Sequence, residues 1–346
     1  MSARSLPGLY PEELQTLVQS WGEPAYRARQ VFEWIHRHGV LDPSLMTNVP
    51  VAIRERLGAL AAEEVLRLHS SDALTTKLLL RMRDGQQIEA VEMNTETGRK
   101  TICVSTQAGC AMGCVFCVTG QFGFARNLDA GEIVEQVLRF SSAERPVTNV
   151  VFMGMGEPLA NYEETLRAIR LLTHPQGLHL GARRITVSTS GLVPQMRRLA
   201  DEHLQLGLAV SLHAPHDELR SELMPVNRRW PIAEVVAAAD HYAAVTGRRV
   251  SYEYTLMAGV NDSDELADDL AELLRGRLCH VNLIPMNPSE DQRLRAPTTE
   301  RALAFETRLR QAGIAATIRV NRGRDILAAC GQLRLAEKKR PIALGV

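Results

Sequence analysis

The sequence predicts an α/β fold in which a parallel sheet forms a partial or complete (β/α) barrel, preceded by a small helical region. Two observations support this prediction. From about residue 148 onward, short runs with strand composition alternate with amphipathic stretches of helical length, as in parallel α/β sheets. Ahead of them, residues 11–60 have helical periodicity and residues 62–95 have the pattern of a hairpin.

The composition is that of an ordinary globular chain. Its 346 residues allow one large or two modest domains, and 45% of them are hydrophobic. This excludes a disordered chain, a collagen-like fibre and a disulfide scaffold, since six cysteines are too few for the last. The 40 basic and 40 acidic side chains cancel, so the chain lacks the basic surplus of many nucleic-acid binders.

We expect a cytoplasmic protein without a membrane partner. The N-terminal residues have no apolar signal-peptide core, and no stretch reaches the roughly 18 apolar residues that cross a bilayer. In a reducing compartment, clustered thiols serve as metal ligands or catalysts rather than as disulfides.

The elements follow in order along the chain. Pro11 and Pro24 each precede an amphipathic helical stretch, and Asp84-Gly85 separates the two apolar strands of the hairpin. A further strand is expected at 100–105. The later strands are expected at 148–153, 184–189, 207–212, 249–256, 279–285 and 315–320. The helices between them are expected at 162–172, 232–245, 264–275 and 299–312.

Several of these strands end in polar or turn-forming residues. Examples are the segments Gly154–Pro158, Ser188–Gly191, Ser211–His213 and Asn287-Pro288. In parallel α/β sheets, chemistry collects at the carboxyl ends of the strands. We therefore expect these segments to line the functional site.

The spacing Cys110-x3-Cys114-x2-Cys117 is the strongest chemical signal in the chain. A structural zinc site takes four ligands, and no histidine lies between His69 and His174. Three thiolates can hold a four-iron cluster and leave one iron open for a ligand. Chance spacing, or zinc completed by a distant ligand, remains the alternative.

The segment from Cys110 to Cys117 resembles the CxxxCxxC signature of the radical S-adenosylmethionine (SAM) enzymes, including the aromatic Phe116 before the third cysteine. Further blocks resemble the RlmN/Cfr family of RNA adenosine methyltransferases and follow that family's order across residues 88–333. They are Cys103–Cys110, Gly123–Leu128, Met153–Leu159, Ser188–Gly191, Ser211–Pro215, Asn282–Pro288 and Ala329–Leu333. Residues 1–60 resemble the family more loosely, chiefly in Tyr26–Gln30.

The resemblance implies a partial (β/α) barrel of the radical SAM type with a small N-terminal helical accessory domain. It implies an RNA-facing domain at 1–60, a β-hairpin linker at 61–98 and a radical SAM core at 99–346. It also implies a [4Fe–4S] cluster bound by Cys110, Cys114 and Cys117, and SAM, used twice per turnover. The residues that it implies for binding SAM are Gly156, Glu157, Ser188, Ser211, Leu212, His213 and Asn287.

The resemblance also implies three catalytic residues. Cys330 would accept a methyl group from a first SAM, and the radical made from a second SAM would activate that methyl group for addition to adenine. Cys103 would resolve the adduct through a transient disulfide, and Glu89 would accept the ring proton. A radical route suits this substrate because carbon 2 or carbon 8 of adenine is too electron-poor to attack the SAM methyl group. We interpret Cys279 as structural.

The implied partners are ribosomal RNA, transfer RNA and an electron donor such as flavodoxin or ferredoxin. The charge distribution agrees with an RNA partner. Residues 314–346 hold seven basic and two acidic residues, and residues 24–56 hold five arginines and three acids. The negative charge that offsets these basic segments includes six acidic residues between Asp262 and Leu273, which we expect to form one solvated helix.

We expect methylation of carbon 2 of adenosine in 23S ribosomal RNA and in the anticodon loop of certain transfer RNAs. Carbon 8, the Cfr-type product, remains the alternative, because Gly113 and Val118–Gly120 occur in both branches of the family. Two other classes remain: a non-catalytic iron–sulfur RNA sensor, and a radical SAM enzyme acting on a protein or small metabolite.

Overall fold

The computed structural model describes residues 5–57, 62–142, 145–287, 294–319, 323, 325–328 and 331–333. Cys330 and most of the basic C-terminal segment lie outside the described residues. Within the part that is described, no helix is long and apolar enough to cross a membrane.

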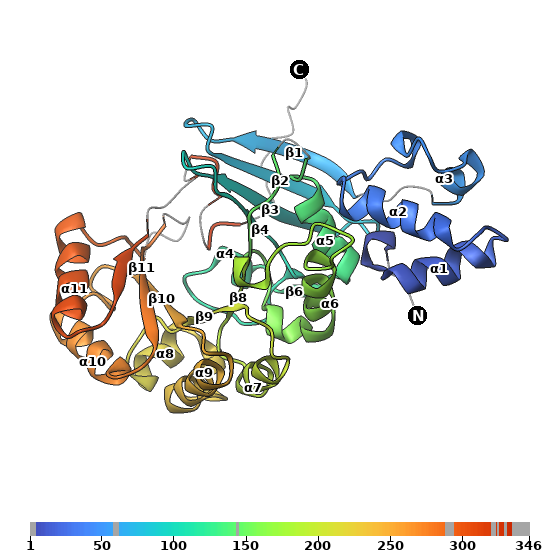
Figure 1. The fold of residues 1–346 in the computed structure, drawn as a ribbon. Coiled ribbons are helices and arrows are strands. Elements are labelled where there is room, and N and C mark those ends of the chain that lie inside the picture. Colours follow the sequence, from blue (N-terminus) through green and yellow to red (C-terminus); the bar gives the residue numbers. More distant parts are fainter. Residues whose placement is uncertain are drawn as a thin grey trace, which may run out of the picture.

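The N-terminal region is helical, as predicted, and projects from one side of the molecule (Figure 1). Its helices are α1 (Pro11–Ser20), α2 (Tyr26–His36) and α3 (Val51–Leu57), with 3-10 turns at Leu6–Gly8 and Pro43–Leu45. Ser5 donates from its backbone N and its Oγ to the carboxylate of Asp129. A Cβ on Gly8 would lie 2.7 Å from the backbone N of Gly131, so the segment packs directly on the helix that follows Asp129.

One sheet of ten strands runs through most of the remaining chain. In spatial order its strands are β1 (Glu63–His69), β2 (Thr75–Arg81), β3 (Gln87–Asn94), β4 (Lys100–Cys103), β7 (Asn149–Phe152), β8 (Ile185–Thr189), β9 (Gly207–Ser211), β10 (Val250–Leu256), β11 (Cys279–Pro285) and β12 (Ala316–Ile318). The pairs from β4 to β12 are parallel, and the pairs from β1 to β4 are antiparallel. The predicted hairpin therefore extends the barrel sheet.

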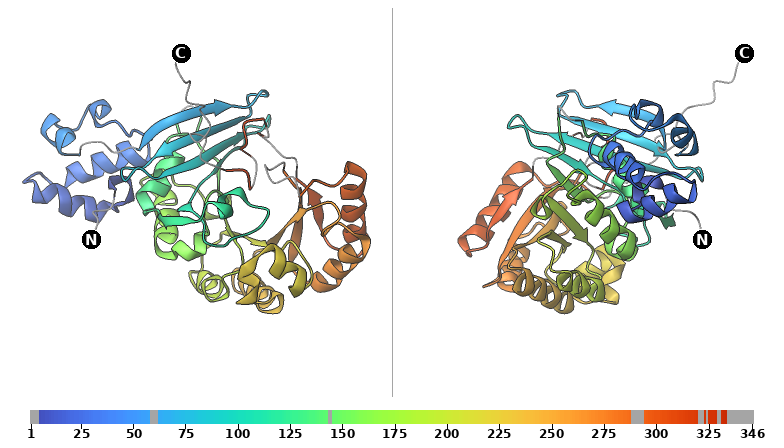
Figure 2. Two further views of the ribbon diagram at one scale, coloured as in Figure 1. Left: turned by 180° about the vertical axis from the view of Figure 1, so that it is seen from behind. Right: turned by 45° about the vertical axis from the view of Figure 1, so that its right-hand side comes forward.

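Helices cover the outside of the curved sheet and leave its inner face open toward the site (Figure 2). They are α5 (Ala130–Leu138), α6 (Tyr162–Leu172), α7 (Val193–Asp201), α8 (Asp217–Leu223), α9 (Ile232–Thr246), α10 (Asp264–Leu274) and α11 (Thr299–Gln311). The remaining short elements are β5 (Gln107–Gly109), α4 (Val118–Gln121), β6 (Phe124–Asn127) and 3-10 turns at Pro158–Asn161, Ala182–Arg184 and Pro225–Arg228.

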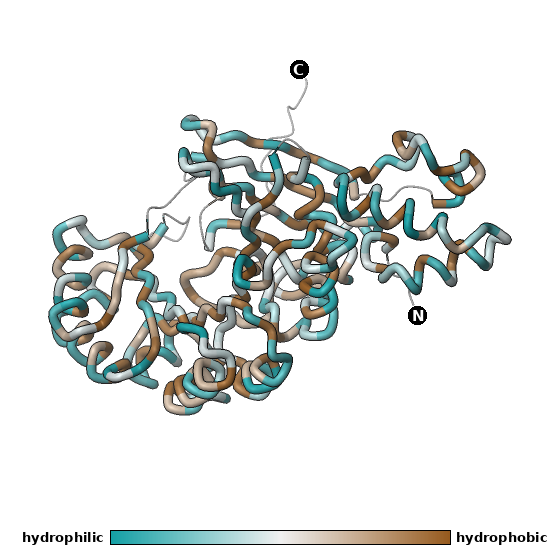
Figure 3. The backbone as a smooth tube through the Cα atoms, viewed as in Figure 1, coloured by the Kyte–Doolittle hydropathy of each residue, from teal (hydrophilic) through white to brown (hydrophobic). Residues whose placement is uncertain are grey.

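Hydrophobic positions recur along the strands and alternate with hydrophilic ones in the outer helices (Figure 3). The terminal strands β1 and β12 are not paired with each other among the described residues, so the barrel is partial, as the family resemblance implied. The predicted strand and helix positions from residue 148 onward are confirmed to within a few residues.

The acidic helix differs from the expectation in one respect. It is α10, and it is exposed to solvent, but Asp264 and Asp268 form ion pairs with arginines of α11. Arg308 lies 2.7 Å from Asp268 and 3.0 Å from Asp264. Part of the acidic charge is therefore neutralised within the fold by residues about 40 positions later, which local charge counting could not show.

Candidate active site

Two cavities meet inside the open barrel. The first, the strand-end pocket, has a volume of about 170 Å³ and is lined by Cys110, Cys114, Cys117, Gly156, Glu157, Ser188, Ser211, His213 and Asn287, among others. The second, the inner cavity, has a volume of about 440 Å³ and contains Cys103. Met153, Glu253 and Arg319 line both cavities, so the two share a wall.

The three clustered cysteines lie on the loop between β5 and α4. Cys110 donates its backbone N–H to Gly123 O at 2.8 Å, and Cys117 donates to Cys114 O at 3.1 Å, which curls the loop tightly. Burial raises the pKa of Cys110 to about 11 and raises that of Cys114 further, so neutral thiols are favoured until a metal binds them.

The donor set fits a cluster better than a single ion. Among the described residues, no three Cys, His, Asp or Glu side chains converge as one metal ion requires. The thiolates of a four-iron cluster instead bind separate irons. The apolar side chains of Met112 and Phe116 line the same pocket and lower the local polarity around the thiols.

The segment after β7 forms one wall of the strand-end pocket. Gly156 has a φ of +99°, and a Cβ there would lie 2.5 Å from the Cβ of Gln107, so the close approach of the two backbones requires glycine. Glu157 is buried, and its carboxylate accepts from Leu159 N at 3.0 Å and Ser190 N at 2.7 Å. Burial raises the pKa of Glu157, and the two backbone donors oppose that shift.

The other predicted cofactor residues lie at neighbouring strand ends. Ser188 and Ser211 are close to the carboxyl ends of β8 and β9, and both line the strand-end pocket with Asn287. Leu212 differs, because its side chain is fully buried in the hydrophobic core. Leu212 can therefore contribute only its backbone to a ligand.

His213 is a rigid wall of the strand-end pocket. Its Nδ1 accepts from Thr255 N at 2.9 Å, and its ring meets Phe116 edge-on at 4.5 Å between centroids. Burial, with a smaller contribution from the positive charge of Arg220, lowers the pKa of His213 to about 3. The imidazole is therefore neutral at physiological pH.

Arg220, on α8, is a site residue that the sequence did not indicate. It is fully buried and donates to Leu212 O (3.1 Å), Asn227 Oδ1 (2.7 Å), Ser190 O (2.7 Å) and Ser211 O (2.9 Å). Burial lowers its pKa to about 10, which keeps it charged at neutral pH. One guanidinium thus holds the ends of β8 and β9 together beneath the pocket; an isolated arginine in a short helix gives no sequence signal for this role.

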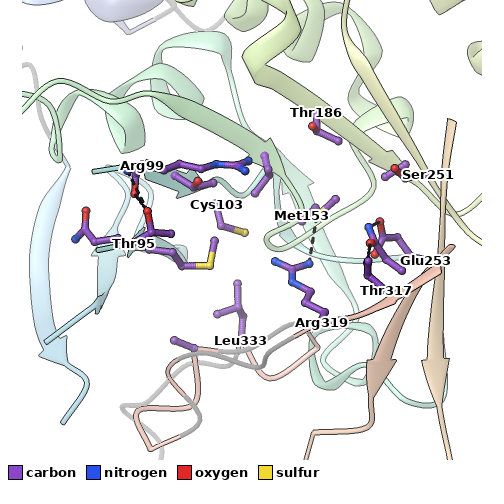
Figure 4. Close-up of a pocket in the computed structure, with 17 residues that line it drawn as sticks. Thr95, Arg99, Cys103, Met153, Thr186, Ser251, Glu253, Thr317, Arg319 and Leu333 are labelled. Carbon is purple, nitrogen blue, oxygen red and sulfur yellow. Dashed lines mark hydrogen bonds between the residues drawn. The ribbon is translucent and has the colours of Figure 1, made fainter. Parts of the chain in front are cut away.

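Cys103 is the last residue of β4 and lies in the wall of the inner cavity (Figure 4), which none of the three clustered cysteines lines. Ala328 also lines the inner cavity, and Gly331 lines the strand-end pocket. Two hydrogen bonds join residues 331–333 to α4. Val118 N donates to Gly331 O at 2.9 Å, and Thr119 Oγ1 donates to Leu333 O at 2.9 Å.

Glu89 lies on β3, is completely buried, and lines neither of the two cavities. Its Oε1 is 3.0 Å from Nζ of the buried Lys77. The same ammonium group donates to Leu327 O at 3.1 Å. Lys77 therefore links Glu89 to the chain segment that precedes residue 330.

Cys279 is buried at the start of β11, away from both cavities, in agreement with its interpretation as structural. The structure thus brings together the three clustered cysteines and six of the seven predicted cofactor residues. Cys103 lines the neighbouring inner cavity instead, and Glu89 lines neither cavity and pairs with Lys77.

Comparisons with known proteins agree with this geometry. Residues 104–271 match the radical SAM superfamily, and residues 5–62 match the ribosomal RNA large subunit methyltransferase N-terminal domain. The chain is 50% identical to the probable dual-specificity RNA methyltransferase RlmN of Symbiobacterium thermophilum, over 96% of this chain and 92% of that protein. It is 47% identical to the dual-specificity RNA methyltransferase RlmN of Sorangium cellulosum, over 97% of both chains.

The fold has a solved counterpart. The crystal structure of a radical SAM methyltransferase from Sphaerobacter thermophilus superposes with a TM-score of 0.93 at 51% identity, covering 96% of this chain and 99% of that one. Radical SAM proteins bind a [4Fe–4S] cluster and SAM, which suits the thiols and strand ends of the pocket. The chain therefore belongs to the RlmN family of the radical SAM superfamily.

Proposed function

We propose that this chain methylates carbon 2 of adenosine in 23S ribosomal RNA, and of adenosine in the anticodon loop of certain transfer RNAs, through a methyl-cysteine intermediate. The observation that supports this most strongly is the wall shared by the strand-end pocket and the inner cavity. A cluster-bearing pocket beside a cavity that holds a separate thiol suits a reaction in which the methyl group travels through the protein. The near full-length similarity to dual-specificity RNA methyltransferases supports the RNA substrates.

In this proposal, Cys110, Cys114 and Cys117 hold the cluster. SAM is held by Gly156, Glu157, Ser188, Ser211, His213, Asn287 and the backbone of Leu212. A buried carboxylate such as Glu157 is a suitable partner for the ammonium group of SAM, because each of its oxygens keeps a lone pair after accepting one backbone N–H. When bound, the cluster and SAM supply the one-electron chemistry that activates an otherwise inert methyl group.

Cys330 is the proposed methyl carrier: its thiolate takes a methyl group from one SAM and becomes a thioether, and a second SAM is consumed in activating that group. Cys330 lies outside the described residues. Its assignment is supported by its described neighbours, since Ala328 lines the inner cavity and Gly331 lines the strand-end pocket.

Cys103 and Glu89 complete the proposal. Glu89 accepts the proton that leaves the ring carbon, and the Sγ of Cys103 attacks the Sγ of Cys330 to release the methylated base, leaving a disulfide that an external thiol reduces. The position of Cys103 in the inner cavity supports its role. The link from Glu89 through Lys77 to Leu327 O supports a role for Glu89 near the carrier segment.

The division into an RNA-facing domain at 1–60, a β-hairpin linker at 61–98 and a radical SAM core at 99–346 belongs to the same proposal. We further propose that a flavodoxin or ferredoxin donates the electron, and that the protein acts in the cytoplasm on RNA drawn to its basic segments.

Mass spectrometry of RNA tests the product. Ribosomal and transfer RNA should be compared from cells that lack the gene, cells that carry it and cells that carry the Cys330→Ala variant. We expect 2-methyladenosine only where the intact protein is present. A product methylated solely at carbon 8 would replace the proposal with the Cfr-type activity, and no RNA methylation in any strain would overturn it.

A further inference from the structure

The inner cavity has polar side chains in its wall that the cofactor does not account for. Successive strands contribute Thr101, Thr186, Ser251, Glu253, Asn282 and Thr317 to its wall. Figure 4 shows Cys103 and Glu253 on opposite sides of the cavity, with Met153 and Arg319 between them. Its volume of about 440 Å³ falls in the range of small-molecule sites, roughly 300–1,000 Å³. A single purine nucleoside is small enough to enter it.

Glu253 is the most unusual residue of this wall. It lies in the middle of β10 and is 4% exposed. Its Oε1 accepts from Asn282 Nδ2 at 2.9 Å, whereas its Oε2 has no hydrogen-bond partner among the described residues. A buried acceptor without a donor costs free energy, so a site of this kind is completed by a ligand that brings an N–H or O–H group.

The carboxylate is also held in a fixed orientation. Asn282 Oδ1 accepts from Thr317 Oγ1 at 3.2 Å, and Thr317 Oγ1 is 2.9 Å from His280 Nε2. This chain of contacts leads from Glu253 across β11 and β12 to the half-buried His280. A carboxylate supported from behind in this way recognises a donor more selectively than a mobile one does.

Glu157 provides a contrast within the same site. It is a deeply buried carboxylate of the strand-end pocket, and both of its oxygens already accept backbone N–H groups. Of these two carboxylates, Glu253 alone keeps an oxygen without a partner among the described residues. It lines both cavities, and it shares the inner one with Cys103, the thiol that must reach the RNA adduct. The geometry therefore favours an RNA base over SAM as the donor.

Adenine carries a single exocyclic amino group, which is the only N–H donor on its base edges. Uracil has no amino group, and the amino group of guanine occupies carbon 2 itself. We propose, on the basis of the function proposed above, that the inner cavity receives the target base and that Glu253 determines specificity by accepting a hydrogen bond from the exocyclic amino group of adenine.

The proposal is tested by measuring methylation with both the protein and the RNA substrate varied. The two substrates are transcripts of the target ribosomal RNA fragment, one with adenosine and one with purine riboside, which lacks the amino group, at the target position. The proteins are wild type, Glu253→Gln and Glu253→Ala. In Glu253→Gln, the amide oxygen can still accept from Asn282, so the NH2 group faces the cavity and meets the adenine donor unfavourably.

We expect wild type to lose about 10- to 100-fold in kcat/KM for methylation when the amino group is removed from the RNA. On the adenosine RNA, both variants should lose a similar factor in kcat/KM. On the purine-riboside RNA, their kcat/KM should fall by less than about twofold relative to wild type, because the hydrogen bond is already absent there and can be lost only once. The matched control is Ser251→Ala, two residues away on the same strand face, which should leave the ratio between the two RNAs unchanged.

Equal losses on both RNAs in the Glu253 variants would overturn the proposal. If those losses accompany weaker SAM binding, Glu253 serves SAM instead. Competition binding of the two RNAs to wild type and Glu253→Gln is measured without reductant, so that it tests base recognition separately from methylation. If the wild type methylates neither RNA, the proposed function is contradicted. The role of Glu253 is still decided by binding: the proposal expects wild type to prefer adenosine RNA and Glu253→Gln to lose that preference.

Discussion

The strand-end pocket and the inner cavity are adjacent, but the protein builds them in different ways. The pocket is lined largely by loops and strand ends, and its residues come from short sequence blocks such as the one that holds Gly156 and Glu157. The cavity is lined mainly by side chains within the strands of the large sheet, one or two from each contributing strand, with further residues from the connecting segments. Cofactor chemistry is therefore concentrated in short motifs, whereas the cavity depends on how distant strands are aligned.

The two regions also differ in how their buried charges are satisfied. Around the strand-end pocket, Glu157 and Arg220 are surrounded by backbone partners. At the wall that the two cavities share, Glu253 keeps one oxygen without a partner among the described residues. Under the proposal made above, the strand-end pocket is preorganised for the cofactor, whereas the wall shared with the inner cavity is completed by the substrate. Variants that affect one region without the other test this division.

The largest effect is expected from Cys114→Ala. Loss of one of three cluster ligands should remove iron from the purified protein and abolish SAM cleavage, a loss of at least about 1,000-fold. Iron content and 5′-deoxyadenosine formation measure this. Cys279→Ala, which removes a buried thiol outside both cavities, is the control and should retain both iron and activity.

Arg220→Met should mainly affect stability. It leaves three backbone carbonyls and Asn227 Oδ1 without their buried donor, and unsatisfied buried acceptors of this kind should lower the free energy of unfolding by about 3–5 kcal/mol in total. Denaturant unfolding measures it. Arg198, half exposed and paired with Glu163, is the control, and Arg198→Met should cost less than about 1 kcal/mol. Equal costs would show that Arg220 does not organise the strand ends.

The roles of Cys114 and Arg220 differ in how far they could be predicted from the sequence. The CxxxCxxC spacing predicted Cys114 as a cluster ligand, because three ligands of one cluster must be close in sequence when they share a loop. Arg220 contacts strand ends that precede it by 8, 9 and 30 residues, and no local pattern records such contacts. The strands and helices after residue 148 were predictable from periodicity.

The inner cavity was not predictable, apart from Cys103. Glu253 occupies one position of a hydrophobic strand, and its environment arises from its alignment with Asn282 on β11 and from the contact of Asn282 with Thr317 on β12. The strand β1 and the helices α5, α7 and α8 were also absent from the prediction. The first is mostly exposed, and each of the three helices has only seven to nine residues.

Glu157→Gln should weaken SAM binding by about 10- to 100-fold, because the amide lacks the negative charge and can accept from only one of the two backbone N–H groups. Equilibrium binding of SAM measures this. The control is Glu92→Gln, a buried carboxylate paired with Lys100 away from both cavities. Unchanged SAM affinity in Glu157→Gln would remove this carboxylate from the cofactor site.

The smallest effect concerns pH and His213. Its pKa is about 3 in the folded protein and about 6.5 when unfolded, so the unfolded chain binds more protons between these values. Its contribution to stability is complete above pH 6.5 and is lost as pH falls, by at most about 1.4 kcal/mol per pH unit. His213→Asn should reduce the dependence of unfolding free energy on pH between 6.5 and 5, and the half-exposed control His241→Asn should not.

The division between the two cavities is tested most directly by Cys103→Ala, incubated with reductant, SAM and target RNA. Because Cys103 lies in the inner cavity and not in the strand-end pocket, the variant should still form 5′-deoxyadenosine. It should release no methylated RNA and should accumulate RNA covalently attached at Cys330, visible by mass spectrometry of the digested protein. Release of methylated RNA at the wild-type rate, or 5′-deoxyadenosine formation without attached RNA, would contradict this account.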